Sequence, residues 1–423
     1  MAPPPNAGAA QTPPRAAEPC RALLRGLEAA GLAEAAAGQK NRSSGCWAAL
    51  LVGEERSSSA ARPECQKGRQ LAALLVGART QLAAKSPSCG AQSQLLARLL
   101  AADLPAVLLA ALDGIGFEER KAAAGLVEDV LTAGLRHGVS ARQQVCCYLR
   151  GQPQVADLLL CGCRSGELAF LCGQLLSACA GDAAVAELLL EGGAPMRLVS
   201  TARAPCCFEV ASTALAALQE LLLGGAEASA AYLLENFREF FLVYHDLLQC
   251  SDYATKRQAL SVLSRVLLSP GFGGVMARYG SSARSLKLQM TLLLHPTTMV
   301  KVGAFHIFKI FVANPHQAPA VQEILFKNRE GLARLLRSMR ELCEASDKEL
   351  REDLVAVAAG LLGMRRPEGR TPHARDLRQH CQPMRAGPGG AHQEWSDLFV
   401  ATPASRESES LALSEAVAFV GVH

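Results

Sequence analysis

Apolar positions in the central part of the chain recur with the spacing of amphipathic helices. Segments such as YATKRQALSVLSRVLL and VKVGAFHIFKIFVANP place apolar side chains three and four positions apart, with polar residues between them. This spacing puts the apolar residues on one face of a helix, so it predicts consecutive helices. Pro296 and the pair Asn314-Pro315 follow two such segments as typical helix terminators. Asp252 is suited to cap the helix that begins at Tyr253.

A longer repeat is superimposed on the helical pattern. From each of three starting residues, small or apolar side chains lie 6, 7, 10, 13 and 14 positions ahead, and the starts are 45 residues apart (208 to 253, then 253 to 298). A period of about 40–47 residues is typical of HEAT and armadillo repeats, whose units bury their apolar faces only against neighbouring units. A single large helical bundle, the alternative, requires no fixed period. The three sets are Phe208 with Ala214, Leu215, Leu218, Leu221 and Leu222; Tyr253 with Ala259, Leu260, Leu263, Val266 and Leu267; and Thr298 with Ala304, Phe305, Phe308, Phe311 and Val312, while looser copies begin at Phe117 and Gly166.

The repeat predicts an all-α, armadillo/HEAT-like helical-repeat solenoid over residues 19–363, with loops between about Ser57 and Gln92. The flanks differ in composition: residues 1–18 are Pro/Ala-rich, and residues 364–423 are charged and Pro/Gly-rich. Both flanks are predicted to be low-complexity and disordered, the tail for most of its length. Within the tail, residues 395–399 (WSDLF) form an aromatic island, which we interpret either as an incidental helical turn or as a short motif that docks on a groove.

Composition supports a helical protein without pointing to nucleic acid. Hydrophobic residues make up 50% and aromatic residues 5%, so Ala and Leu, both strong helix formers, supply most of the apolar surface. The 43 basic and 39 acidic side chains nearly balance, whereas nucleic-acid binders usually carry a clustered basic stripe. Most of the 15 Cys lie inside apolar helical pattern, which is typical of reduced thiols. With neither a signal-peptide h-region nor a run long enough to span a bilayer, the expected location is cytoplasmic.

No catalytic or metal-binding motif stands out. The sequence contains no G-x-x-x-x-G-K-[ST] loop, no G-x-S-x-G elbow and no H-E-x-x-H pair. The pairs Cys146-Cys147, Cys161-x-Cys163 and Cys206-Cys207 lack the paired C-x-x-C spacing of zinc sites. His306 lies between two phenylalanines and is most simply a packed residue. We therefore expect neither an enzyme nor a cofactor or metal, although a hydrolase or transferase in the divergent N-terminal third is a rival hypothesis.

Several strings carry a family resemblance. They are Tyr253 with the run 255–258 (TKRQ), the run 286–288 (LKL) and the run 304–315 (AFHIFKIFVANP), with weaker matches at Phe117-Glu118, Lys121 and residues 167–176. These strings resemble the calcium-binding protein 39 family, also called mouse protein 25, over about residues 90–360 and most strongly over the last third. Despite that name, the sequence has no EF-hand loop of alternating acidic residues. The resemblance implies an armadillo/HEAT-like scaffold that binds a pseudokinase and activates its partner kinase.

The resemblance also implies binding residues. A C-terminal pocket for a peptide ending in Trp-Glu-Phe matches Met290, whose thioether adapts to an aromatic ring, and Lys327, whose ammonium can pair with a carboxylate. Concave-face residues that contact the pseudokinase match Tyr253, Arg257 and Phe272.

Contacts to the active kinase match Lys121 and Phe208. Phe272 follows Pro270-Gly271, which predicts an exposed aromatic at a loop or helix start. Two departures concern the same face: a lysine of the family is replaced by Ser261, and a basic loop by residues 269–271.

The expected function is therefore a non-catalytic scaffold, a monomer within a hetero-complex, that binds and allosterically activates a kinase or pseudokinase of the germinal-centre (sterile-twenty) type. The alternative is a general helical-repeat adaptor that has kept the fold and changed partners, which the replaced residues at Ser261 and 269–271 permit. The sequence names neither the partner kinase nor the pathway.

Overall fold

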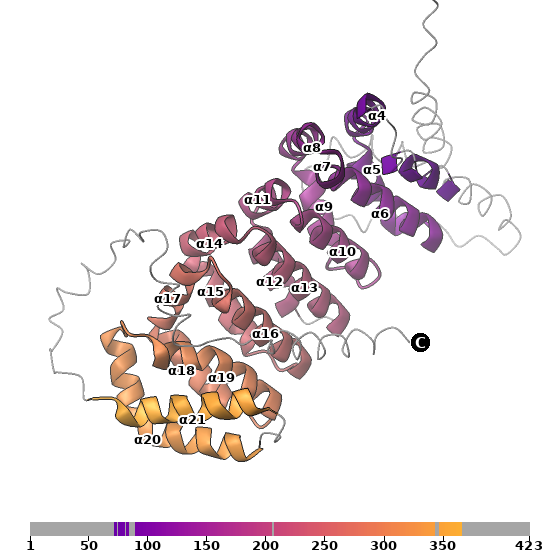
Figure 1. The fold of residues 1–423 in the computed structure, drawn as a ribbon. Helices are drawn as coiled ribbons and strands as arrows, with labels where there is room; N and C mark the ends of the chain where they lie inside the picture. The colour runs from indigo at the N-terminus through magenta and orange to yellow at the C-terminus, as the bar shows by residue number, and fades with distance from the viewer. Residues whose placement is uncertain are drawn as a thin grey trace, which may run out of the picture. The chain divides into compact units, whose positions relative to one another are not determined.

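A computed structural model describes most of the predicted repeat region (Figure 1). The described residues are 72–73, 75–80, 82–83, 89–204, 207–342 and 347–365. The predictions for residues 1–18, for Cys206 and for the tail beyond Arg365, including residues 395–399, lie outside them. Every regular element within the described ranges is a helix. The described chain thus has the predicted all-α, armadillo/HEAT-like helical-repeat architecture.

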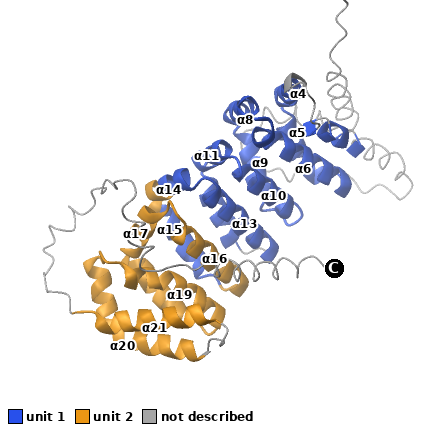
Figure 2. Cartoon of the chain, in the orientation of Figure 1, with its two compact units in different colours: residues 1–232, 238–250 blue, residues 233–237, 251–423 orange. Residues whose placement is uncertain are grey.

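The chain divides into two compact units, coloured separately in Figure 2. Unit 1 comprises residues 1–232 and 238–250, and unit 2 comprises residues 233–237 and 251–423. Helices α14 (Ala226–Glu235) and α15 (Phe237–Leu248) contain two of the three sequence boundaries between the units, and the third follows α15, between Cys250 and Ser251.

The other helices fall within a single unit. Unit 1 contains α4 (Cys89–Ala101), α5 (Leu104–Ala111), the 3-10 helix η3 (Leu112–Gly114), α6 (Phe117–Leu131), α7 (Ala133–His137), α8 (Val139–Gly151), α9 (Gln154–Gly162), α10 (Ala169–Ala180), α11 (Ala183–Glu191), α12 (Ala194–Arg203) and α13 (Phe208–Gly224). Unit 2 contains α16 (Tyr253–Leu268), α17 (Gly273–Gly280), α18 (Ala283–Leu293), α19 (Thr298–Ala313), α20 (Pro319–Leu342) and α21 (Lys348–Gly363).

Each copy of the repeat found in the sequence corresponds to one helix of the structure. Phe117, Phe208, Tyr253 and Thr298 are the first residues of α6, α13, α16 and α19, and α10 begins three residues after Gly166. We call α6, α10, α13, α16 and α19 the third helices of their repeats. The small and apolar residues 6 and 7 positions ahead of the three strong starts are all 0% exposed: Ala214, Leu215, Ala259, Leu260, Ala304 and Phe305. The period was therefore visible because each third helix buries the same positions.

Third helices stack on one another within each unit. In unit 1, α10 packs against α6 and α13, and in unit 2, α19 packs against α16 and α21. Glycine makes some of these approaches possible: a Cβ on Gly224, at the end of α13, would clash with the carbonyl oxygen of Ala180 in α10. A Cβ on Gly303 of α19 would lie 3.2 Å from Cβ of Leu260 in α16.

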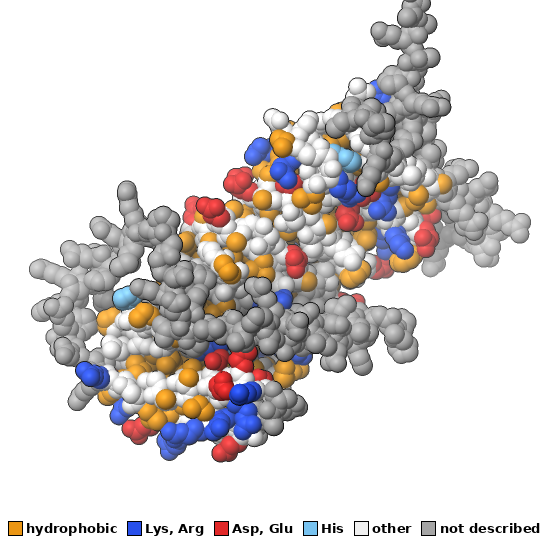
Figure 3. Space-filling view, in the orientation of Figure 1, with side chains coloured by type: hydrophobic (Ala, Val, Ile, Leu, Met, Phe, Trp, Pro, Cys, Tyr) orange, Lys and Arg blue, Asp and Glu red, His pale blue; other side chains and the backbone are white. Residues whose placement is uncertain are grey.

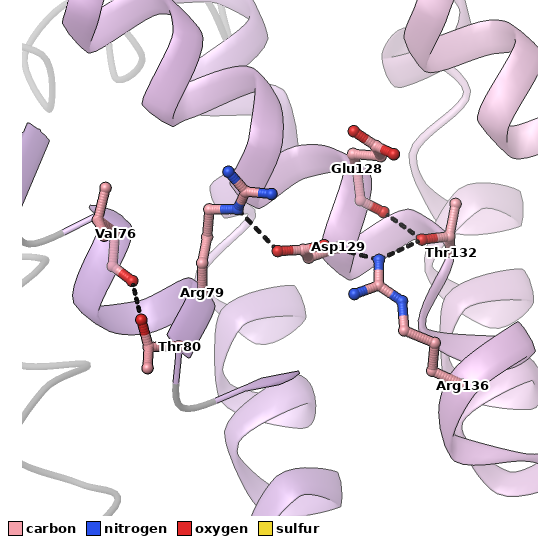
Figure 4. A network of polar contacts seen from close by, with 7 residues as sticks. All are labelled: Val76, Arg79, Thr80, Glu128, Asp129, Thr132 and Arg136. Atoms are coloured by element: carbon pink, nitrogen blue, oxygen red, sulfur yellow. Dashed lines mark hydrogen bonds and ion pairs between the residues drawn. The ribbon is translucent and has the colours of Figure 1, made fainter. Parts of the chain in front are cut away.

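Polar contacts about one repeat apart reinforce the stacking. In Figure 4 the buried carboxylate of Asp129 on α6 accepts from Arg79 Nε (2.8 Å) and from Arg136 Nη2 (2.6 Å) on α7. The first of these pairs joins residues 50 positions apart. Arg142 and Asp182 are 40 positions apart and lie 2.8 Å from each other (Nε to Oδ2). Sequence patterns did not reveal these pairs, because each partner alone reads as an ordinary surface charge.

The predicted helix boundaries are largely confirmed. The Asp252 carboxylate accepts from the backbone N–H of Thr255 at 2.7 Å, as an N-cap should. Hydrogen bonding by the side chain of Thr255, and then by its backbone N–H, lowers the pKa of Asp252 because it stabilises the charged carboxylate. The predicted loop between Ser57 and Gln92 is wrong in part. Described residues within 72–83 are helical and α4 begins at Cys89, because the Ala/Leu-rich sequence there favours helix over its single glycine.

Candidate functional site

The first two turns of α16 carry the candidate binding residues of unit 2. Tyr253 begins the helix and is 39% exposed. Arg257 lies one turn later on the same side of the helix and is part-buried. Within the described residues, Arg257 forms no hydrogen bond or ion pair. An aromatic ring and an unpaired guanidinium side by side are a combination that protein interfaces favour.

Phe272 does not belong to this surface. Its side chain is 0% exposed, so the prediction of an exposed aromatic is wrong. Gly271 adopts a left-handed backbone conformation (φ 94°), which reverses the chain just before Phe272. Phe272 then serves as the N-cap residue of α17, with its carbonyl oxygen accepting from Met276 N at 2.8 Å. The turn places the ring in the core of unit 2, where it stabilises the start of α17.

Met290 and Lys327 lie on two helices of unit 2 that contact each other, α18 and α20. Met290 is part-buried, and Lys327 has a side chain that is 69% exposed. Lys327 Nζ lies 2.7 Å from Oε1 of Glu323 one turn earlier, and this neighbour lowers the pKa of Glu323. Exposed pairs of this kind contribute little stability. A ligand carboxylate could therefore replace Glu323 as the partner of Lys327 at small cost.

Lys121 and Phe208 lie in unit 1, on the third helices α6 and α13. Lys121 is exposed, and it forms no ion pair within the part of the chain that the structure describes. Phe208 is 45% exposed at the start of α13. Two further exposed rings also lie at the start of a third helix. Phe117 at the start of α6 is 75% exposed, and Phe170, the second residue of α10, is 66% exposed.

Phe170 is an exposed aromatic residue that was not predicted from the sequence. The repeat pattern could have predicted its exposure, because Phe170 lies four positions after the repeat start at Gly166. The equivalent positions are Lys121 after Phe117 and Arg257 after Tyr253, both of which the resemblance singled out.

The cysteines and His306 give no indication of catalysis. Burial raises the pKa of the Cys172 thiol to about 12, and it raises the pKa of Cys163 as well. Such thiols stay protonated, which makes them poor nucleophiles and poor metal ligands. Among the described residues, no three His, Cys, Asp or Glu side chains come together as a metal site. Burial and the nearby Lys309 lower the pKa of His306 to about 4, so its ring is neutral.

The surface character fits a protein-binding role. On the face drawn in Figure 3, Lys and Arg side chains are interspersed with Asp and Glu rather than gathered into one continuous stripe. None of the described helices is by itself long and apolar enough to cross a membrane. The stacked repeats and the mixed surface charges define the class of protein: a helical-repeat scaffold whose exposed third-helix residues are available to protein partners.

Comparison with known proteins identifies the family. Residues 48–360 match the Mo25-like family model, and the chain belongs to this family. A Mo25-like protein of Schizosaccharomyces pombe is 36% identical over 231 residues, covering 55% of this chain and 69% of the relative. Calcium-binding protein 39-like of Homo sapiens is 30% identical over 249 residues, covering 59% and 72% respectively. The resemblance read from the sequence is thereby confirmed, and the chain is a non-catalytic helical scaffold with protein partners.

One solved structure is similar to part of this chain. A computationally designed armadillo repeat protein for modular peptide recognition has a TM-score of 0.40 and 15% identity, covering 61% of this chain and 99% of its own.

Proposed function

We propose that this scaffold binds a germinal-centre (sterile-twenty-type) kinase or a pseudokinase–kinase complex in the cytoplasm and stabilises its active conformation. The observation that carries the proposal is the start of α16, where Tyr253 is exposed and Arg257 has no partner within the described residues. A part-buried guanidinium without an acceptor in the described part of its own chain can form a charge-assisted hydrogen bond with an acceptor of a partner protein. A kinase carboxylate or carbonyl opposite Arg257 would provide one.

The mechanism is a population shift. A rigid helical surface that binds the closed kinase conformer better than the open one raises the active fraction without touching ATP. Preferential binding by about 10⁴-fold would convert a kinase that is about 1% active into one that is about 99% active. Stacked helices suit this role, because their packed interior resists deformation when the partner binds.

A second contact would be the peptide pocket of Met290 and Lys327. A peptide ending in Trp-Glu-Phe would place its ring against the Met290 thioether and a carboxylate on Lys327. If this peptide is tethered to the kinase-binding partner, the two contacts reinforce each other through a high effective concentration.

The pocket is tested by fluorescence anisotropy of a labelled peptide ending in Trp-Glu-Phe. We expect saturable micromolar binding that Lys327→Ala weakens about tenfold, the loss of one charge-assisted contact. Lys348→Ala is the matched control, because Lys348 forms a similar exposed pair with the acid one turn later, Glu352 (3.7 Å). Equal binding by the Lys327→Ala variant would remove Lys327 from the pocket.

The kinase contact is tested separately, by capture and activation of purified germinal-centre kinases. We expect Arg257→Ala to reduce both, and Arg337→Ala, an exposed arginine of α20 in the same unit, to leave them unchanged.

The alternative function is a general adaptor with other partners. Two observations favour it: Ser261 carries no positive charge at a position where the family has one, and the Phe272 ring is buried rather than available. A protein that binds the Trp-Glu-Phe peptide but captures no kinase of this type would support the adaptor and refute kinase activation.

A further inference from the structure

A small cavity in unit 1 lies apart from all residues discussed for kinase binding. It has a volume of about 180 Å³ and is lined by residues at the end of α9 and on α12, two helices that contact each other. Its walls combine two guanidinium groups, two hydroxyl groups and two apolar side chains: Arg164, Arg197, Ser200, Thr201, Leu160 and Met196. No lining residue is acidic, so the cavity presents hydrogen-bond donors and positive charge.

Arg197 is held in place across the two helices. Its Nη1 atom donates to Oδ1 of Asp157 on α9, and its Nη2 atom lies 3.9 Å from Sγ of Cys161. A guanidinium has five N–H donors, and these contacts use two of them. These contacts orient Arg197 toward α9 and leave three of its donors for a ligand.

Arg164 lies just beyond the end of α9 and has no such restraint. Its backbone N–H donates to the Cys161 carbonyl at 3.0 Å, while its side chain is exposed. Within the described residues the Arg164 guanidinium forms no hydrogen bond or ion pair. Counting Arg164, Arg197 and Asp157, the site carries a net charge of about +1 and at least eight free N–H donors.

We propose that this cavity binds a phosphate monoester on the serine or threonine side chain of a partner protein. Two arginines recognise a tetrahedral phosphate with several charge-assisted hydrogen bonds, and its three acceptor oxygens use more of the free donors than a carboxylate can. Ser200 Oγ donates to the Met196 carbonyl at 2.8 Å, which turns the hydroxyl away until a ligand competes for it.

The size of the cavity determines the class of ligand. Pockets for whole small molecules are usually about 300–1,000 Å³, so about 180 Å³ accommodates one side-chain headgroup. The rest of the ligand lies outside, where the part-buried side chain of Met196 offers an apolar contact. A phosphorylated peptide meets both conditions, with the phosphate inside and neighbouring apolar residues at the rim.

The test uses the full chain with ¹³C-labelled methionine methyl groups, because Met196 lines the cavity and reports directly on occupancy. Its signal is assigned by Met196→Leu. Three pools of peptides with randomised flanks and central phosphoserine, glutamate or serine are titrated, together with inorganic phosphate. The phosphoserine pool should shift the Met196 signal saturably, at a concentration about tenfold or more below that of the glutamate pool or inorganic phosphate.

Arg164→Gln should weaken the phosphoserine response about tenfold or more without unfolding the protein, since Arg164 has no internal contacts to lose. Arg150→Gln, an exposed arginine of α8 in the same unit, is the control and should behave as the parent. The proposal is overturned by any of three results: no saturable shift, equal affinity for the glutamate pool or inorganic phosphate, or an unchanged response in the Arg164→Gln variant.

Discussion

The neutral ring of His306 makes the stability of unit 2 depend on pH. His306 lies on α19, part-buried, with its ring centroid 6.2 Å from that of Phe305. Burial is the main cause of its lowered pKa; Lys309 adds to the effect, while Asp353 and Asp347 oppose it. The pKa falls from 6.5 to about 4 on folding, so the unfolded chain binds a proton more readily than the folded one. The contribution of His306 to the free energy of unfolding is therefore fully present above pH 6.5, and it is lost as the pH falls from there toward 4.

The size of this loss follows from the difference between the pKa values of His306 in the folded and unfolded states. Between about pH 7.5 and about pH 5, a pKa of about 4 in the folded state and 6.5 in the unfolded state removes about 2 kcal/mol of stability. Urea denaturation followed by circular dichroism at the two pH values measures this loss. His306→Gln is neutral at both values, so its loss should be about 2 kcal/mol smaller than that of the parent, all other titrating groups being shared.

Two results would refute the reasoning. One is an equal loss of stability in the parent and in the His306→Gln variant. The other is an NMR titration of the folded parent in which the ring protons of His306 titrate near pH 6.5, which would mean that burial does not suppress its protonation.

Three further substitutions test the packing, capping and polar contacts of the stack. Gly224→Ala should destabilise by about 1–3 kcal/mol, because its Cβ meets the Ala180 carbonyl, whereas Gly151→Ala at the end of α8 meets nothing and should be neutral or slightly stabilising in thermal denaturation. Asp252→Ala should cost about 1 kcal/mol at neutral pH and progressively less as the pH falls below 3.8 toward the lowered pKa of the folded state, where the parent carboxylate becomes protonated; equal stability of the two proteins at pH 7 would contradict a capping role. Asp129→Asn should cost about 2 kcal/mol in urea denaturation, since the neutral amide keeps one acceptor oxygen and turns an NH2 donor toward the other arginine, while both half-exposed arginines stay hydrated; an unchanged midpoint would show that the network is not formed.

The repeat could be predicted from the sequence because its signal is local and redundant. A third helix buries residues at offsets 6, 7, 10, 13 and 14, and the same offsets recur in each copy, so one noisy copy such as that from Gly166 does not hide the period. The N-cap at Asp252 could be predicted for the same reason, because Asp252 and its partner Thr255 are only three residues apart. Contacts such as that of Arg142 with Asp182 are different, because the chain between the partners folds through a whole repeat and each residue alone resembles a solvated charge. The cavity between α9 and α12 was hidden for the same reason.

Phe272 shows that a family resemblance can predict the position of the backbone without predicting whether a side chain is buried. Matching a residue to a binding face indicates where the backbone lies, but burial depends on the local turn, here set by Gly271 at φ 94°. Because the ring is 0% exposed, Phe272→Ala should cost about 3–5 kcal/mol of stability, whereas Tyr253→Ala at the exposed start of α16 should change stability by less than about 0.5 kcal/mol.

Loss of kinase capture in the Phe272→Ala variant would thus reflect a damaged α17, and only the Tyr253→Ala variant would report on a contact. If Phe272→Ala instead unfolds at the urea concentration of the parent and still fails to capture the kinase, the ring lies outside the core in solution. Phe272 would then again be a candidate binding residue, as the family resemblance implies.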